Sequence, residues 1–475
     1  MRADLCYLDA TKLASLIGEK RLSPLEVVRA HLERISSVNP QINAVVTVMA
    51  DEALEAARAA ESAVMRGGVL GSLHGVPFTI KDSLDSAGVR TVRGSRLFFG
   101  NVPDHDATAV ARFRTAGAIP IAKTNVPEFS YWTETDNLAF GRTLNPWNPD
   151  RTPGGSSGGE AAAIAAGLSP IGLGSDVAIS IRGPAHYCGI VGLKATHGRI
   201  PFTGHWPDVL RRYWHVGPMA RSVQDVAMAL SVLAGPDGRD GYAAAAASVG
   251  AGDAPASGKA IRVGSMAEAG FGPVDPEVAA TVAAAALALG DLGCKTEPVR
   301  LASLEECDWN VLSATLFSAE ATPYFRKIAG DRVPELHPVM RRVLSRPEAS
   351  LRDYVAAQRE AERLRSEFAA YFERYDALLC PVVPIPAPPH DLDEYIVAGT
   401  SVPARHVVRA TVPFNLAGLP ALSVPFGWSE DGLPIGVQLV GKWFDELTIL
   451  RLGALLESAS EVRNRRPGCQ RSADR

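Results

Sequence analysis

The sequence predicts an α/β fold in which a large mixed β-sheet is covered by helices on both faces. Two observations support this prediction. Segments with the apolar spacing of helices alternate with short β-branched runs along most of the 475 residues, which is the pattern of sheets covered by helices. The composition, with 47% hydrophobic and 21% charged residues, is that of a globular protein with a large core. No internal period indicates a repeat architecture.

The first part of the chain is predicted to be largely helical. Ser23-Pro24-Leu25-Glu26 is a capping box with proline at the first helical position, and a second helix is expected at about 51–65. The β-branched and aromatic residues at 76–80 predict a buried strand that ends at Lys81. Residues 104–124 predict a helix, a glycine stop and a short strand, and a long loop follows.

The second part predicts a return to strands at the end of the chain. Its expected elements are helices at SVQDVAMALSVLAG, 276–290, 304–375 and ELTILRLGALLES, and strands at AIRVGSM, ALLCPVVP, PALSVPFGW and IGVQLVG. Residues 235–259 are low in complexity and read as a surface loop or a seam between two halves. We expect one domain over residues 1–462 and a disordered tail at 463–475.

Charge and cysteine usage narrow the class of partner. The net charge is −4, so there is no basic surplus for nucleic acid or an anionic membrane, and a small-molecule partner is expected. The six cysteines show no CxxC pair or regular spacing, which fits a reducing compartment better than disulfides or zinc. The start of the chain lacks a signal-peptide pattern. We therefore expect a cytoplasmic protein without a cofactor or metal.

The stretch 151–199 concentrates glycines and serines with very few charges, and it is the predicted active site. A phosphate-binding loop would need GxxxxGK[ST] or a GxGxxG after a strand, and GGSSGGE provides neither. Ser157 formally lies at the centre of GxSxG. That motif requires a preceding buried strand, whereas NPWNPDRTP reads as a proline-rich loop.

A third interpretation uses two serines and a distant lysine. Ser156 and Ser180 are separated by a predicted helix at 160–166 and a short return, so both could face one pocket. A serine hydroxyl attacks an amide only if another group takes its proton. Lysine can do this when burial leaves it neutral, which gives Lys81 a role. The alternative is that Lys81 ends its strand in solvent.

The sequence resembles the amidase signature family of serine hydrolases. The resemblance covers nearly the whole chain and rests on HGVPFTIKD, KTNVPEF, RTPGGSSGGEAAAIAAGLSPIGLGSD, SIRGPAHYCGIVGLK, PFNLAGLPALSVP and GLPIGVQLVG. By motif position it implies Lys81 as base, Ser156 as a proton relay that follows a cis peptide bond, and Ser180 as nucleophile. It further implies an acyl-enzyme on Ser180.

The resemblance also implies the groups around the nucleophile. The backbone N–H groups of Val177, Ala178, Ile179 and Ser180 would form the oxyanion hole. Ser157 and Asp176 would orient these residues, and Arg182 would anchor the turn. The family usually has two glycines where this chain has Ala178 and Ile179. The hole could therefore be distorted, its backbone could already suit side chains, or Ile179 could narrow the acyl pocket. Ala195 replaces a common proline.

The resemblance leaves the substrate open, because members cleave amides, carbamates (urethanes) and esters. Aromatic residues near the expected entrance favour an apolar or aryl substrate, with packing as the alternative; they are Tyr131, Trp132, Trp206 and Trp214. THGRIPFTGHWPD and HVGPMARS are similar to bacterial members that act on aryl amides and carbamates. The alternatives are an amidotransferase-type subunit and a catalytically impaired binding protein. A homodimer is a further expectation.

Overall fold

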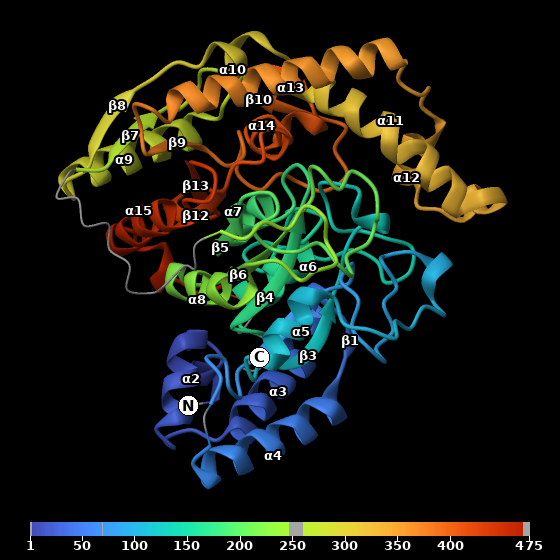
Figure 1. Ribbon diagram of the computed structural model, residues 1–475, viewed down its shortest axis with the longest axis vertical. Helices are drawn as coiled ribbons and strands as arrows, with labels where there is room; N and C mark the ends of the chain where they lie inside the picture. Colours follow the sequence, from blue (N-terminus) through green and yellow to red (C-terminus); the bar gives the residue numbers. More distant parts are fainter. Residues whose placement is uncertain (1, 69, 247–259, 469–475) are drawn as a thin grey trace.

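A central β-sheet dominates the computed structural model of the chain, which describes residues 2–68, 70–246 and 260–468 (Figure 1). Among these residues, eleven strands form one sheet, and its order is β1-β3-β2-β4-β6-β5-β12-β13-β9-β7-β8. In this order the strands span Val45–Val48, Ile119–Thr124, Pro77–Lys81, Ile171–Asp176, His215–Ala220, Val191–Lys194, Ala421–Trp428, Pro434–Gly441, Ala377–Pro381, Arg262–Ser265 and Lys295–Pro298. A separate hairpin consists of β10 (Glu394–Val397) and β11 (Thr400–Pro403).

The sheet is mixed. Strand β2 is parallel to β3 and β4, and β7 is parallel to β8 and β9, whereas the other neighbouring pairs are antiparallel. Parallel strands need crossover connections, and the helices between them supply these connections. Because β2 and β4 are parallel neighbours, their carboxyl ends, at Lys81 and Asp176, lie at the same edge of the sheet.

Helices cover both faces of the sheet, which confirms the predicted fold class. The N-terminal helices are α1 (Arg2–Leu5), α2 (Ala10–Gly18), α3 (Pro24–Ile42), α4 (Ala50–Arg66) and α5 (Thr108–Thr115). Helices α6 (Gly158–Ala165) and α7 (Arg182–Cys188) pack on one face. Helices α8 (Val223–Leu233), α9 (Pro276–Asp291) and α15 (Glu446–Ala459) pack on the other. Successive residues of β4 point to opposite faces of the sheet, which fits this arrangement. Gly172 and Gly174 lie close to α6 and the residues that flank it, whereas Ile171 and Leu173 belong to the core that contains α8.

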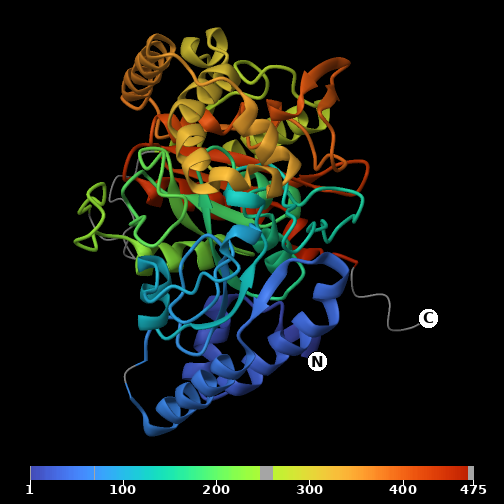
Figure 2. The ribbon, with the colours of Figure 1, turned by 90° about the vertical axis from the view of Figure 1, so that its right-hand side faces the viewer.

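A helical layer stands over one end of the sheet (Figures 1 and 2). It consists of α10 (Ala302–Glu306), α11 (Trp309–Ala329), α12 (Pro338–Ser345), α13 (Leu351–Tyr371) and α14 (Val412–Leu416). The sequence predicted helix throughout 304–375, but the structure breaks it into α10–α13. A 3₁₀ turn that contains Pro334 and the start of α12 at Pro338 interrupt the helical pattern, as expected for residues without an N–H donor.

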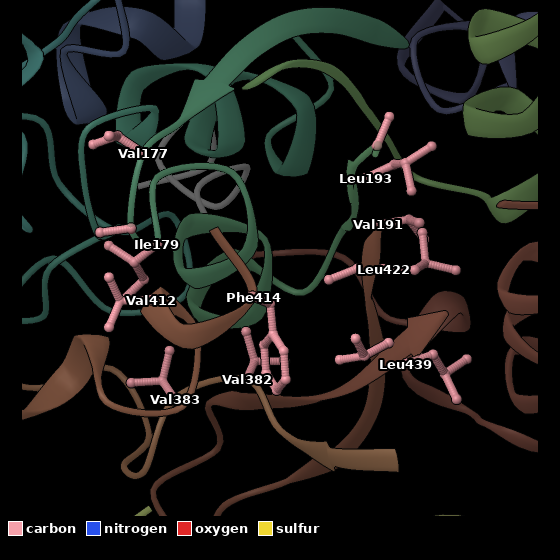
Figure 3. Close-up of a cluster of buried hydrophobic side chains, with 14 of the residues drawn as sticks. Val177, Ile179, Val191, Leu193, Val382, Val383, Val412, Phe414, Leu422 and Leu439 are labelled. Atoms are coloured by element: carbon pink, nitrogen blue, oxygen red, sulfur yellow. The ribbon is translucent and has the colours of Figure 1, made fainter. Parts of the chain in front are cut away.

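The N-terminal and C-terminal halves of the chain share one core. They meet where β5 pairs with β12, and Figure 3 shows side chains from both halves gathered in one buried cluster. The labelled members come from the loop after β4, from β5, from the segment directly after β9, and from α14, β12 and β13. We therefore propose that residues 1–462 fold as one domain.

The predicted seam and tail lie partly outside the described residues. Residues 247–259 of the seam and 469–475 of the tail are not described. The described start of the tail lies against the body of the molecule, since Arg463 forms ion pairs with Glu457 and Asp9. Arg466 pairs with Asp4. Over the described residues, no helix combines the length and apolar character needed to span a membrane.

Candidate active site

Lys81 is the last residue of β2, and its side chain is completely buried. Its Nζ atom lies 2.7 Å from Ser156 Oγ, 2.9 Å from Ser175 Oγ and 3.2 Å from the Ser175 carbonyl oxygen. The neighbouring Asp82 contacts a different lysine, Lys123, at 3.6 Å. The alternative of a strand-end lysine in solvent is therefore wrong, and among the described residues no carboxylate forms an ion pair with Lys81.

The surroundings of Lys81 favour its neutral form. Burial lowers the pKa of Lys81 to about 7, because desolvation disfavours the ammonium, while Asp176 and Glu160 act in the opposite direction. Glu160 is itself buried and accepts hydrogen bonds from the Thr79 and Thr124 hydroxyls. Burial raises the pKa of Glu160 to about 7. Near neutral pH, a substantial fraction of Lys81 can therefore accept a proton.

Ser156 lies in the loop before α6, next to Lys81. The peptide bond between Gly155 and Ser156 is cis, as the resemblance implied. A Cβ atom on Gly155 would lie 2.7 Å from both the Glu134 amide nitrogen and the Trp132 carbonyl oxygen. The backbone here approaches the preceding loop so closely that only glycine fits.

Ser180 lies between β4 and α7 and lines a pocket. Its carbonyl oxygen accepts a hydrogen bond of 3.2 Å from the Ser157 N–H, which holds the two serine loops together. Ser157 is completely buried, whereas a nucleophile elbow exposes its central serine, so that interpretation of Ser157 is wrong. Among the described residues, the Ser156 hydroxyl is bonded to Lys81 and not to Ser180.

The four residues of the loop 177–180 all line the pocket. Their backbone N–H groups donate to no acceptor among the described residues. Unpaired backbone donors are rare in protein interiors unless a ligand or water accepts from them. Ala178 and Ile179 both have negative φ, so the backbone suits ordinary side chains at both positions. The loop is therefore a candidate oxyanion-binding site, in spite of the missing glycines.

Asp176 and Arg182 fix the two ends of this loop. Asp176 accepts from the Ile181 N–H at 3.0 Å and forms an ion pair of 3.0 Å with Arg182. The Arg182 guanidinium also donates to the Thr411 carbonyl oxygen and to Gln438 Oε1, at 2.9 and 2.8 Å. Burial alone would raise the pKa of Asp176, but Arg182 lowers it below its usual value. Arg182 thus ties the loop to the C-terminal half.

The empty space in the pocket beside Ser180 is about 680 Å³, which includes the part that is open to solvent. Its walls come from the loop 130–133, the loop 177–180, α11, α12 and the 3₁₀ helix Ala404–Val408. Tyr131 and Trp132 line it, as the sequence suggested. Trp206 packs against Phe98 and Phe129, and Trp214 against His205, outside the pocket lining. A substrate contact by these last two tryptophans stays a prediction.

Sequence reasoning missed several residues of the site. Ser175 joins His205 to Lys81, because His205 Nε2 lies 2.7 Å from Ser175 Oγ. His205 Nε2 also lies 3.2 Å from Ser83 Oγ. Arg346 and Arg405 line the pocket. Ser175 could have been found as the residue just before Asp176, at the end of the short return that follows the predicted helix at 160–166. No local signal marks the others.

Known proteins are similar to this chain in sequence and in architecture. A family model described as Amidase matches residues 26–450. A glutamyl-tRNA(Gln) amidotransferase subunit from Moorella thermoacetica is 36% identical, over 98% of this chain and 99% of that protein. The structure of a 6-aminohexanoate cyclic dimer hydrolase has a TM-score of 0.87 at 31% identity, over 98% of this chain and 99% of its own. A bacterial aryl acylamidase has a TM-score of 0.85 at 27% identity, over 97% and 99%.

Proposed function

This chain belongs to the amidase signature family, and on that premise we propose that it hydrolyses amide C–N bonds with Ser180 as nucleophile, Ser156 as proton relay and Lys81 as base. One observation carries the proposal. A completely buried lysine without an ion-pair partner among the described residues lies 2.7 Å from Ser156, next to a serine that opens into a pocket. Such a lysine has the surroundings of a catalytic base.

In the proposed reaction Ser156 first passes a proton from Ser180 to Lys81 and later passes a proton from Lys81 to the leaving amine. Neutral Lys81 takes the proton of Ser156 while Ser156 takes that of Ser180, and Ser180 Oγ bonds to the carbonyl carbon of the substrate. The tetrahedral intermediate collapses when the C–N bond breaks and the relay returns the proton to the leaving amine. The Ser180 ester then reacts with water, activated in the same way, and releases the acid.

The orientation of the Lys81 lone pair depends on Ser175. A neutral amine has two hydrogens, and the Ser175 carbonyl and hydroxyl oxygens can accept both. The lone pair then points at Ser156. This requires the Ser175 hydroxyl to donate elsewhere, and His205 Nε2 is the acceptor at 2.7 Å. Burial, with Lys81 and Arg93 nearby, holds the pKa of His205 well below its usual value, so the imidazole is neutral. The proposal takes the tautomer with its hydrogen on Nδ1, in which Nε2 can accept this hydrogen bond.

The loop 177–180 would stabilise the oxyanion of the tetrahedral intermediate. Its backbone N–H groups have no acceptor among the described residues and line the same pocket as the Ser180 hydroxyl. A single donor of this kind typically contributes about 10²–10³ to the rate. The Asp176–Arg182 ion pair and the Ser157 contact would keep these donors in place when the substrate leaves.

The finer assignments remain part of the proposal. Tyr131 and Trp132 in the pocket, and the similarity to an aryl acylamidase, support an aryl or apolar part of the substrate. Carbamates and esters would react through the same acyl-enzyme. A cytoplasmic location, a single small-molecule partner and a homodimer are proposed with them.

A second candidate function is that of an amidotransferase-type subunit. The full-length similarity to a glutamyl-tRNA(Gln) amidotransferase component favours it. That function predicts hydrolysis of glutamine that rises when partner subunits are added. A catalytically impaired binding protein is the third interpretation, and the Ala178-Ile179 substitution motivates it.

A substrate panel separates these functions. The purified chain would be assayed with 4-nitroanilides, 4-nitrophenyl carbamates, short primary amides and glutamine, each with Ser180→Ala as the matched control. The proposal predicts nitroanilide hydrolysis that is lost in Ser180→Ala. Activity on glutamine alone would favour the amidotransferase function, and a folded chain inactive on every substrate would favour the impaired protein.

A further inference from the structure

Two arginines face the pocket beside Ser180 without a carboxylate to balance them. Arg346 follows α12, and Arg405 lies in the 3₁₀ helix Ala404–Val408; both line the pocket. The pocket lining contains no aspartate or glutamate among the described residues. The opening that leads to the nucleophile therefore carries two positive charges.

The Arg405 guanidinium makes few contacts within the described part of the chain. Its Nη2 atom donates to Ser313 Oγ at 3.1 Å, while its Nε atom is buried and has no partner among the described residues. Burial lowers the pKa of Arg405, and the charge of Arg346 lowers it further. The Tyr131 phenol nearby does not neutralise it, because burial raises the pKa of Tyr131 above its usual value.

Other arginines of the same region show the contrast. Arg342, on α12, pairs with Asp393 at 2.9 Å, and Arg326, on α11, pairs with Glu348 at 2.6 Å. Within the described part of the chain, neither Arg346 nor Arg405 forms an ion pair. Two neighbouring guanidinium groups repel. The Nε–H of Arg405 is buried without an acceptor among the described residues, although the Arg405 side chain as a whole is half-buried and Arg346 is exposed. A bound ligand with a negative charge would offset the repulsion between the two guanidinium groups and give the Arg405 Nε–H an acceptor.

We propose that the substrate is an amide that also carries a carboxylate, which Arg405 and Arg346 bind while Ser180 attacks the amide carbonyl. The inference rests on the proposed hydrolase function and names its substrate class. A guanidinium binds a carboxylate through two parallel N–H donors, which orients the substrate as well as attracting it. The apolar side chains of Phe317, Val343 and Val408 suit a short hydrocarbon spacer between the two groups.

Matched substrates test this proposal. N-succinyl-4-nitroaniline and N-butyryl-4-nitroaniline place a carboxylate or a methyl group at the same position of the acyl chain. N-butyryl-4-aminobenzoate and N-butyrylaniline make the same comparison on the leaving group. In the wild type we expect kcat/KM to be about 10- to 100-fold higher for the charged member of at least one pair, mainly through KM, as for charge-assisted hydrogen bonds.

Arginine variants assign the effect to the pair. The ratio of kcat/KM between the charged and the neutral substrate should fall about tenfold or more in Arg405→Gln and in Arg346→Gln. It should fall less in Arg405→Lys, which keeps the charge. The control is Arg332→Gln, which removes a guanidinium that is paired with Glu335 at 2.8 Å and does not line the pocket. Its preference should equal that of the wild type. Circular dichroism and thermal unfolding verify that each variant is folded.

The outcomes separate the two proposals. A wild type that hydrolyses neutral and charged members of both pairs equally well would overturn the carboxylate proposal and leave the hydrolase function intact. A preference that persists unchanged in both glutamine variants would overturn it as well. Absence of any hydrolysis, together with an unreactive Ser180, would contradict the hydrolase function itself.

Discussion

At the residue scale, the chemistry of Lys81 follows from what surrounds its amine. An ammonium at the end of β2 loses its hydration and gains only neutral partners, Ser156 and Ser175, so its pKa falls to about 7. Glu160 is near enough to oppose this fall, but it is held by two threonine hydroxyls and does not contact the amine. A lysine that keeps no carboxylate partner can serve as a base near neutral pH.

The proposed donation from the Ser175 hydroxyl to His205 Nε2 predicts a measurable effect on kcat. Without an acceptor at His205, the Ser175 hydroxyl can donate to Lys81 and occupy the lone pair that Ser156 needs. We expect His205→Phe to lower kcat about tenfold, the worth of roughly one hydrogen bond, with little change in KM. The same substitution in a Ser175→Ala background should have no further effect.

The control for this cycle is Phe202→Leu. Phe202 packs against the His205 ring at a centroid distance of 4.5 Å, so the substitution perturbs the packing of His205 and removes none of its hydrogen bonds. Its kcat should stay close to that of the wild type. If the effects of His205→Phe and Ser175→Ala simply add, His205 does not act through Ser175.

Single residues also show where sequence reasoning stops. The structure places Lys81 against Ser156 and joins Ser180 to the neighbouring Ser157 through a backbone hydrogen bond. Their motifs and the strand before Lys81 allowed these residues to be predicted. His205 lies 30 positions from Ser175, in a loop whose path depends on packing rather than on local pattern. Aromatic composition also does not distinguish a pocket wall from an aromatic core: Tyr131 lines the pocket, whereas Trp206 packs against Phe98 and Phe129.

At the element scale, helix α7 packs directly against the loop 177–180, through the contact between Gly183 and Ile179. A Cβ atom on Gly183 would lie 2.5 Å from Ile179 Cγ1, and Ile179 is 3% exposed. Figure 3 shows Ile179 in the buried cluster with Val412 and Val383. The side chain that replaces a family glycine thus packs into the core, and Gly183 provides its space.

Gly183→Ala should therefore damage the active site. The added methyl must displace Ile179 and the N–H groups on either side of it. We expect kcat to fall by about 10-fold or more, up to the effect of about 10²–10³ for one fully lost oxyanion donor. Adding Ile179→Ala to this variant restores the space and should recover part of the activity. Steady-state kinetics with one nitroanilide would measure both changes.

The matched control is Gly290→Ala in α9. An added Cβ atom there meets only Thr296 Oγ1, at 3.6 Å, so the helix gains propensity without a clash, about 0.5–1 kcal/mol. Activity should be unchanged. A Gly183→Ala protein with wild-type kcat would show that Ile179 does not hold the loop.

Several elements could be predicted and others could not. The helix at α3 and the strands β2, β3, β12 and β13 carry strong capping or β-branched signals. Strand β6 contains glycine and proline and was not expected, because its pairing with β4 and β5 rather than its composition makes it a strand. The layer α10–α14 completes the pocket, and no local pattern indicates which loops it covers.

At the scale of the whole molecule, both halves of the chain build the site. Lys81, Ser156 and Ser180 come from the first half, while Arg405 and the Arg182 partner Gln438 come from the second. The halves share one sheet through β5 and β12. Activity should therefore require both halves to be associated, whether or not the connection between them is intact.

A cut in the connection tests this expectation. Gly241 is exposed, and a Cβ atom there would meet nothing within 4 Å, so a protease recognition sequence can be inserted after it. After cleavage we expect the two fragments to elute together in size-exclusion chromatography, to keep hydrolase activity and to unfold in one calorimetric transition. Fragments that separate while each stays folded would contradict the single domain.

The most direct test of the proposed mechanism is the rate at which a fluorophosphonate modifies the chain, followed by mass spectrometry of its peptides across pH 5–9. We expect modification at Ser180, with a rate that rises with pH and is half-maximal near pH 7, because only neutral Lys81 accepts the proton. Lys81→Met should slow it by about 10²–10⁴ and remove the pH dependence. Modification at another serine, or a Lys81→Met protein that reacts as fast as the wild type, would contradict the account.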